Sequence, residues 1–245
     1  MKQNWLILGG SSSMARAFAR RVAEQGADVF LAGRDMDDLR RMATDCHLRG
    51  AKTSEAIKFD SRKPAEFGAV YERLGKQDGV LNVAVFVSSM PDQADIDKNP
   101  ALVDATIADS FTGPARFLQG FVPMMEERGS GTVVGVASVA GDRGRISNYV
   151  YGAAKAGFAT YLSGLRNRLT RAGGHVVTVK PGFTDTGMTW GIEGMFLVAS
   201  PDAAASDILK AVAKKKNTIY TPFFWRYIMV IITHIPEAIF KKMSI

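Results

Sequence analysis

Residues 5–15 read Trp5-Leu6-Ile7-Leu8-Gly9-Gly10-Ser11-Ser12-Ser13-Met14-Ala15. The apolar residues that open this stretch predict a buried strand, and the small residues after them predict a tight turn. An apolar stripe at helical spacing follows. A strand, a small-residue turn and a helix form the arrangement in which a helix N-terminus binds a diphosphate. We therefore expect dinucleotide contacts from Gly9, Ser11, Ser12, Ser13 and Met14; a plain strand-to-helix turn is the alternative.

Further apolar runs alternate with helical patterns along the chain. Val80 to Val87 is almost continuously apolar, as a strand buried on both faces requires. This alternation predicts an α/β protein: a doubly wound Rossmann fold whose mostly parallel seven-stranded sheet carries helices on both faces. The other predicted strands lie at 5–8, 28–32, 56–60, 132–136 and 175–179, and Ser200-Pro201 marks a helix start.

The composition sets limits on the class of protein. The chain has 245 residues and a net charge of +7, but its basic residues are scattered, so we expect no nucleic-acid partner. The single Cys46 excludes an internal disulfide, and no Cys/His cluster has metal-ligand spacing, so we expect no metal. The first residues lead straight into a strand without a signal-peptide pattern, which favours a cytoplasmic location.

The stretch Ser138 to Lys155 carries the chemistry. A β-branched run leads into Ser138, and Tyr151 and Lys155 come four residues apart at the start of a helical segment. This spacing places the phenol and the ammonium on one helix face. A nearby ammonium is expected to lower the pKa of Tyr151, which would then exchange a proton with a carbonyl or alcohol oxygen. Ser138 is placed to hold the same oxygen; an ordinary surface Tyr and Lys is the alternative.

The end of the second predicted strand bears on the choice of cofactor. The strand ends in Gly33-Arg34-Asp35. An arginine at this position accommodates the 2′-phosphate of NADP, whereas a carboxylate would bind the free 2′-hydroxyl of NAD. Arg34 favours NADP. Asp35 keeps NAD possible, unless it only caps the helix that follows.

Together, the glycine-serine turn and the Ser138, Tyr151 and Lys155 set resemble the short-chain dehydrogenase/reductase family, over nearly the whole chain. The resemblance implies an NAD(P)H-dependent carbonyl reductase or alcohol dehydrogenase with Tyr151 as general acid. Lys155 would also hold the nicotinamide ribose. A homodimer or homotetramer built on the helix of Tyr151 and its neighbour is implied as well. Further cofactor contacts are implied at Asp60, Ser88, Tyr151, Lys155, Pro181, Gly182, Thr184 and Thr186.

The sequence departs from the family pattern at four positions. Ser13 and Ala15 replace two glycines of the turn, and Ser88 stands where a glycine is usual. Ser110, in Ser110-Phe111-Thr112-Gly113, replaces an Asn that joins the proton relay, and we assign it that catalytic place. These changes leave open an alternative: a catalytically impaired homologue that acts as a binding or scaffold partner.

The C-terminal region is unusual. We assign 1–217 to the Rossmann domain, including a substrate lid at 186–200, and 218–245 to an apolar tail. The tail is a candidate membrane-surface anchor, a cover for a lipid-like substrate or an oligomer interface. Residues 141–156 and the tail resemble a bacterial subgroup related to the decaprenylphosphoryl-2-keto-erythro-pentose reductase. That resemblance implies a polyprenyl-phosphate-linked keto-sugar or another lipid-like ketone, and a peripheral location at the inner face of the membrane.

Overall fold

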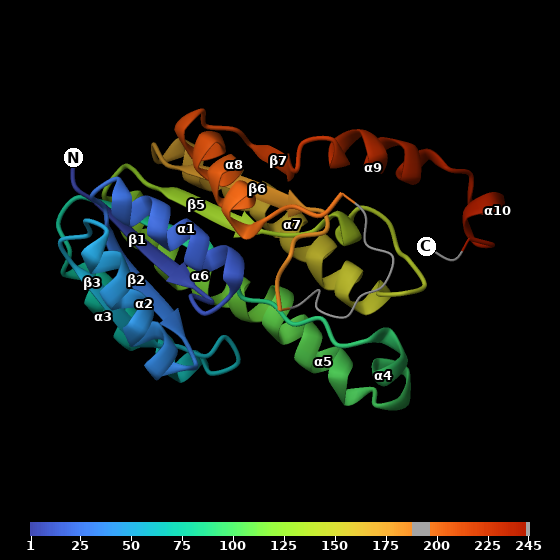
Figure 1. The fold of residues 1–245 in the computed structure, drawn as a ribbon, viewed down its shortest axis with the longest axis horizontal. Helices are drawn as coiled ribbons and strands as arrows, with labels where there is room; N and C mark the ends of the chain where they lie inside the picture. The colour runs from blue at the N-terminus through green and yellow to red at the C-terminus, as the bar shows by residue number, and fades with distance from the viewer. Residues whose placement is uncertain (188–196, 244–245) are drawn as a thin grey trace.

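Seven strands form one sheet in the computed structural model, which describes residues 1–187 and 197–243. Neighbouring strands follow the order β3-β2-β1-β4-β5-β6-β7, and each of the six pairings is parallel (Figure 1). The predicted doubly wound α/β fold with a seven-stranded sheet is confirmed. The strands are β1 Gln3–Leu8, β2 Asp28–Gly33, β3 Ser54–Lys58, β4 Val80–Val85, β5 Thr132–Val136, β6 His175–Pro181 and β7 Thr218–Thr221.

Helices cover both faces of the sheet (Figure 1). One core lies between the sheet and α1, α2 and α8, and a second lies between the sheet and α3, α6 and α7. The helices are α1 Ser13–Glu24, α2 Met36–Leu48, α3 Phe67–Gly75, α4 Gln93–Lys98, α5 Ala101–Ile107, α6 Gly113–Glu127, α7 Tyr149–Arg171, α8 Pro201–Ala213, α9 Trp225–His234 and α10 Glu237–Phe240.

Side-chain caps fix where three of these helices begin. The Ser12 hydroxyl accepts from the amide of Ala15 at the start of α1, and the Asp35 carboxylate accepts from Asp38 N at the start of α2. Ser200 caps α8 in the same way, with Pro201 in the first turn, so the helix start predicted there is confirmed. Asp35 therefore serves as a helix cap, one of the two roles that the sequence left open for it.

Several predicted strand boundaries differ from the structure by two residues, and the strands placed too far along the chain are β3 and the end of β4. β3 runs over Ser54–Lys58 rather than 56–60, and its pairing ends where Lys58 lies opposite Gly33, the last residue of β2. After Lys58 the chain leaves the sheet, and the Phe59 side chain packs into an aromatic cluster. β4 ends at Val85 rather than Val87, because its pairing with β1 and β5 stops there.

The segment expected to form a tail begins inside the sheet. Thr218–Thr221 is β7, which pairs in parallel with β6. α9 and α10 follow and extend past the end of the sheet (Figure 1). Among the helices that the structure describes, none combines the length and the apolar character needed to cross a lipid bilayer.

An aromatic cluster secures the sheet face under α3 and α6. Phe117 on α6 is fully buried, and its ring centroid lies 5.3 Å from Phe59, 5.3 Å from Phe67 and 5.0 Å from Tyr71. Such aromatic pairs stabilise a core beyond their buried area.

We expect Phe117→Ala to lower the free energy of unfolding by about 3–5 kcal/mol, because it leaves a cavity among these three rings. Urea denaturation measures the change. Leu48→Ala is the matched control, since Leu48 is 80% exposed. A loss for Phe117→Ala no larger than that of the control would show that the cluster does not stabilise the sheet.

Candidate active site

Most of the predicted site residues come together at the carboxyl ends of the strands. A cavity of about 970 Å³ opens there, at the edge where parallel α/β sheets bind their ligands. The predicted residues that line it are Ser11, Ser12, Ser13, Met14, Arg34, Ser88, Ser138, Tyr151, Lys155, Pro181, Gly182, Thr184 and Thr186. Gly9 and Asp60 line an adjoining hollow of about 250 Å³, together with Arg34. Ser110 lines neither space.

Tyr151 and Lys155 lie in the first two turns of α7, and both are buried, at 7% and 1% exposure. The Lys155 Nζ donates a hydrogen bond to the Val136 carbonyl at 2.8 Å and lies 5.8 Å from the centroid of the Tyr151 ring. Ser138 follows β5, two residues after Val136, and begins a 3-10 turn. Within that turn, the Ser138 hydroxyl accepts a hydrogen bond from the Ala140 amide. The three side chains predicted to act together therefore line one cavity.

The predicted direction of the Tyr151 pKa is wrong. Burial raises this pKa above its ordinary value, and the hydroxyls of Ser138 and Ser88 only partly oppose the effect. Burial also lowers the pKa of Lys155 to about 7. Removal from water favours the neutral form of each group. This effect outweighs the attraction between the Lys155 ammonium and the Tyr151 phenolate that the spacing alone led us to expect.

The serine that replaces the relay asparagine is linked to the site indirectly. Ser110 lies in the π-helical turn Ala108–Thr112 between α5 and α6, and is fully buried. Its hydroxyl lies 2.9 Å from the Ser88 hydroxyl and bonds to the backbone of Ser89. Ser88 in turn acts on the Tyr151 phenol. Ser110 is therefore connected to Ser88, whose hydroxyl partly opposes the rise in the Tyr151 pKa.

The N-terminal turn fits a dinucleotide despite its replaced glycines. Gly9 has φ +79°, and a Cβ there would lie 2.9 Å from Val87 N, so this position requires glycine. Among the residues that the structure describes, only Leu197 and Lys215 have positive φ without being glycine, so Ser13 and Ala15 need no such conformation. Ser11 to Met14 line the cavity at the N-terminus of α1, where the helix macrodipole favours a phosphate.

The adenosine end of the site carries a cation. Arg34 is exposed at the end of β2 and borders both the cavity and the adjoining hollow. The Asp60 carboxylate borders the hollow and accepts from the amide of Arg62 at 3.0 Å, which closes the turn after β3. Asp35 is committed to capping α2. Of the two candidates that follow β2, Asp35 is thus engaged as a cap, and Arg34 borders the cavity.

The C-terminal segment supplies a wall of the cavity that the sequence did not assign to particular residues. Trp225 of α9 is 2% exposed, lines the cavity and packs edge-on against Phe183 at 5.5 Å. A Cβ on Gly182 would lie 2.0 Å from Trp225 Nε1, so the glycine allows this close approach. Of the substrate lid predicted at 186–200, residues 188–196 lie outside the described residues.

Two further cavity residues were missed. Arg145 and Asn148 lie in the loop before α7 and line the cavity beside Tyr151. The sequence offered one signal, a cation six residues before the tyrosine, but did not show which way its side chain points.

Within 1–187 and 197–243, no three His, Cys, Asp or Glu side chains are grouped to hold a metal ion.

Comparisons with known proteins agree with this geometry. The sequence profile described as short chain dehydrogenase matches residues 3–195. An uncharacterized oxidoreductase of Mycobacterium tuberculosis is 30% identical over 239 residues, covering 97% of this chain and 96% of that protein. The ketoacyl reductase HetN of Nostoc is 27% identical over 226 residues, covering 87% and 76%. A short-chain dehydrogenase from Sphingobium yanoikuyae, solved with NADPH, shares the fold with a TM-score of 0.80 at 22% identity, covering 97% and 98% of the two chains.

The buried lysine leads to a pH prediction. The pKa of Lys155 is about 7 in the folded protein, against about 10.4 in an unfolded chain. The unfolded state therefore binds more protons between these two values, and stability rises with pH across that window. Relative to a Lys155→Met variant, the wild type should gain about 2 kcal/mol of stability from pH 7 to pH 9.

Denaturant unfolding of both proteins at several pH values measures this difference. Lys52→Met is the control, because it removes an exposed lysine and shows the effect of the substitution itself. A difference between wild type and Lys155→Met that does not change from pH 7 to pH 9 would show that Lys155 stays charged throughout.

Proposed function

The chain belongs to the short-chain dehydrogenase family and is an oxidoreductase, and we propose that it reduces a ketone with NADPH in the cavity that holds Ser138, Tyr151 and Lys155. The observation that carries this proposal is the convergence of these three side chains beside the N-terminus of α1. The NADPH bound to the Sphingobium enzyme and the reductase activity named for HetN support it.

Residues of five segments are suited to hold NADPH. Ser11 to Met14 would bind the diphosphate, and Arg34 the 2′-phosphate. Pro181 to Thr186 and Lys155 would lie beside the nicotinamide and its ribose. Asp60 borders the hollow proposed for the adenine. When bound, NADPH supplies the hydride for the carbonyl carbon.

The protein's own residues would supply the proton and the orientation. Ser138 would donate a hydrogen bond to the carbonyl oxygen, and Tyr151 would give its phenolic proton to that oxygen as the alcohol forms. Burial raises the pKa of Tyr151, which keeps the phenol protonated at neutral pH, the form that a reduction requires. Lys155 and the hydroxyls of Ser88 and Ser110 would stabilise the phenolate until a proton from solvent restores it.

We propose a lipid-like ketone as the substrate, with a polyprenyl-phosphate-linked keto-sugar as the specific candidate. The cavity combines cations with apolar side chains, among them Met90, Phe183 and Trp225. A phosphate and a hydrocarbon chain on one molecule would match both kinds of lining.

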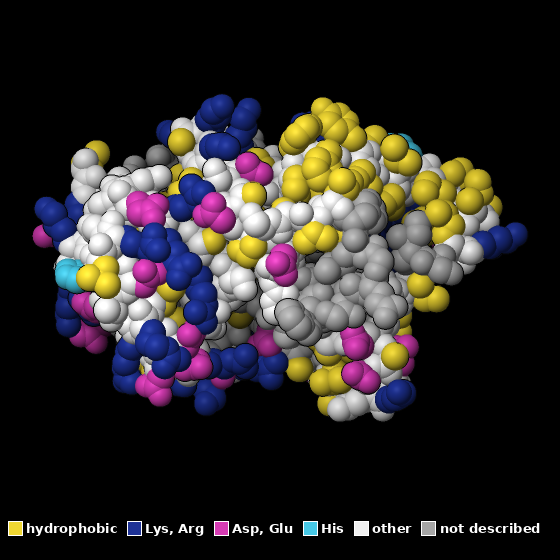
Figure 2. Space-filling model, in the orientation of Figure 1, with side chains coloured by type: hydrophobic (Ala, Val, Ile, Leu, Met, Phe, Trp, Pro, Cys, Tyr) yellow, Lys and Arg dark blue, Asp and Glu magenta, His cyan; other side chains and the backbone are white. Residues whose placement is uncertain are grey.

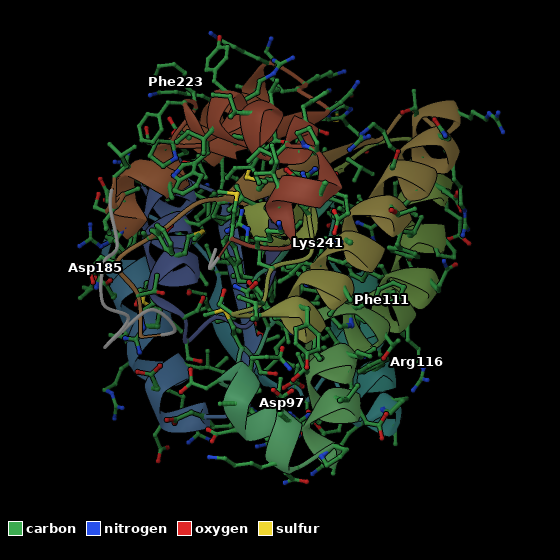
Figure 3. The ribbon with its side chains drawn as sticks, turned by 90° about the vertical axis from the view of Figure 1, so that its right-hand side faces the viewer. Asp97, Phe111, Arg116, Asp185, Phe223 and Lys241 are labelled. Carbon is green, nitrogen blue, oxygen red and sulfur yellow. The ribbon has the colours of Figure 1, made fainter. Side chains whose placement is uncertain are left out.

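We further propose that α9 rests on a membrane surface. Hydrophobic side chains gather over α9 and α10 (Figure 2), and Phe223 lies at the outer surface of this segment (Figure 3). Exposed cations flank them at Arg226, Lys241 and Lys242, as anionic lipid headgroups would favour. The outward apolar side chains are Phe223, Tyr227, Val230, Ile231 and Ile239.

We also propose a homodimer or homotetramer through α6 and α7.

Titration with NADPH and NADH tests the proposed reductase. The wild type should bind NADPH more tightly than NADH and turn over ketones from a panel that includes a short keto ester and long-chain keto compounds. Tyr151→Phe should lower kcat/KM by roughly 10²- to 10⁴-fold, because the acidic proton is lost, while the NADPH dissociation constant stays nearly unchanged.

Two outcomes would contradict this prediction. Activity retained by Tyr151→Phe would remove Tyr151 from the proton-donor role. If neither dinucleotide binds to the wild type, a binding or scaffold protein that has kept the reductase fold becomes the better explanation.

Vesicle binding tests the membrane contact. The double variant Tyr227→Glu, Ile231→Glu places two charges on exposed positions, so the fold should persist and partitioning onto phosphatidylglycerol vesicles should fall at least tenfold. Leu48→Glu, on α2, is the control. Unchanged partitioning together with a smaller particle in size-exclusion chromatography would instead identify α9 as an interface between copies of the chain.

A further inference from the structure

Two arginines of one loop, Arg143 and Arg145, lie in very different surroundings. The Arg143 guanidinium donates to the carbonyls of Ile232 and Ile235 at 2.6 and 2.7 Å, at the C-terminal end of α9. It also pairs with Glu237 and lies 3.7 Å above the Phe240 ring. Arg143 is thus fully engaged in holding α9 and α10 against the body of the protein.

Arg145 lines the cavity and, among the described residues, has no such partners. Its Nη2 lies 3.2 Å from the Met229 sulfur, a weak acceptor, and its Nε is buried without a hydrogen-bond partner. Over 1–187 and 197–243 it forms no ion pair. The carboxylate whose charge acts on it, Asp142, is already bonded to Lys180 and to the Tyr220 hydroxyl. Burial lowers the pKa of Arg145, which reflects how poorly its charge is compensated.

A second buried polar atom without a hydrogen-bond partner among the described residues lies three residues later, in Asn148. Its Oδ1 accepts no hydrogen bond from the part of the chain that the structure describes, although Asn148 also lines the cavity. Buried polar groups in folded proteins nearly always have partners, so each exception needs an explanation. A guanidinium donor and an amide acceptor, both within six residues of Tyr151, would be satisfied together by a ligand that carries an anion and a hydroxyl group.

Building on the reductase proposed above, we infer that Arg145 binds the phosphate group of the substrate and that Asn148 accepts from a neighbouring substrate hydroxyl. A guanidinium matches a phosphate because its N–H groups form two parallel, charge-assisted hydrogen bonds. The substrate class is therefore a phosphorylated hydroxy-ketone. The phosphate belongs either to a lipid-linked sugar or to a soluble sugar phosphate.

This phosphate site is separate from the proposed cofactor contacts. Arg34 and the Ser11 to Met14 turn follow β2 and β1, whereas Arg145 follows β5 and contacts Met229 on α9. Apolar side chains on the α9 side of the cavity include Phe183 and Trp225. A hydrocarbon chain attached to the phosphate would find an apolar wall there.

Calorimetry on the intact protein, with and without NADP⁺, tests the inference. The probes are farnesyl phosphate, ethyl phosphate and farnesol. Arg145→Met should weaken binding of the phosphate probes by roughly 10- to 100-fold and leave farnesol and NADPH binding unchanged. Arg145→Lys should lose less, since it keeps the charge but not the two-pronged geometry. Arg116→Met is the control, because Arg116 is an exposed arginine of α6 (Figure 3).

The outcomes separate the alternatives. Tighter binding of farnesyl phosphate than of ethyl phosphate, lost in Arg145→Met, assigns the site to a lipid-linked phosphate; equal binding of the two assigns it to a soluble phosphate ester. An equal loss for farnesol, a matching loss for NADPH, or no phosphate binding by the wild type overturns the inference. If NADPH does not bind but Arg145-dependent phosphate binding persists, the reductase proposal fails and the phosphate site stands.

Discussion

A single hydrogen bond, from Lys155 Nζ to the Val136 carbonyl, joins α7 to the end of β5. A buried ammonium is costly unless it is compensated, and this one carbonyl replaces only part of the hydrogen bonding that water would provide. Burial accordingly lowers the pKa of Lys155 to about 7. The contact nonetheless fixes the helix at the point where the strand ends. Tyr151, one turn earlier, is thereby held in the cavity that Ser138 enters from the strand side.

The parallel sheet makes this local contact part of a larger site. Because each strand ends at the same edge, the segments after β1, β4, β5 and β6 all reach one cavity. The π-helical turn Ala108–Thr112 extends this arrangement, since it buries Ser110 against Ser88 at 2.9 Å. Turns of this kind often occur at functional sites. In the same turn, burial would raise the pKa of Asp109, but the Arg62 guanidinium holds that pKa below its usual value.

The sequence predicted the fold class and the placement of most site residues in one cavity, because strand periodicity and helical spacing are local properties that the chain displays directly. It did not predict the pKa of Tyr151, because spacing gives the distance to Lys155 but not the burial of both groups. It left Asp35 with two roles, which only the cap on α2 resolved. Trp225 and Arg145 were not assigned to the site, because the direction of a side chain from a loop or a terminal helix depends on tertiary packing.

The packing of α9 links the cavity to the outer surface of the protein. A helix of ten residues is marginal in isolation, so α9 depends on the contacts that hold it. Trp225 and Met229 pack inward, Gly182 leaves room for the indole, and Arg143 satisfies the carbonyls at the C-terminal end. The opposite face of the same helix is apolar and exposed. The helix that presents this face also forms one wall of the cavity and contacts Arg145. In the functions proposed above, surface contact and substrate binding would therefore share one structural element.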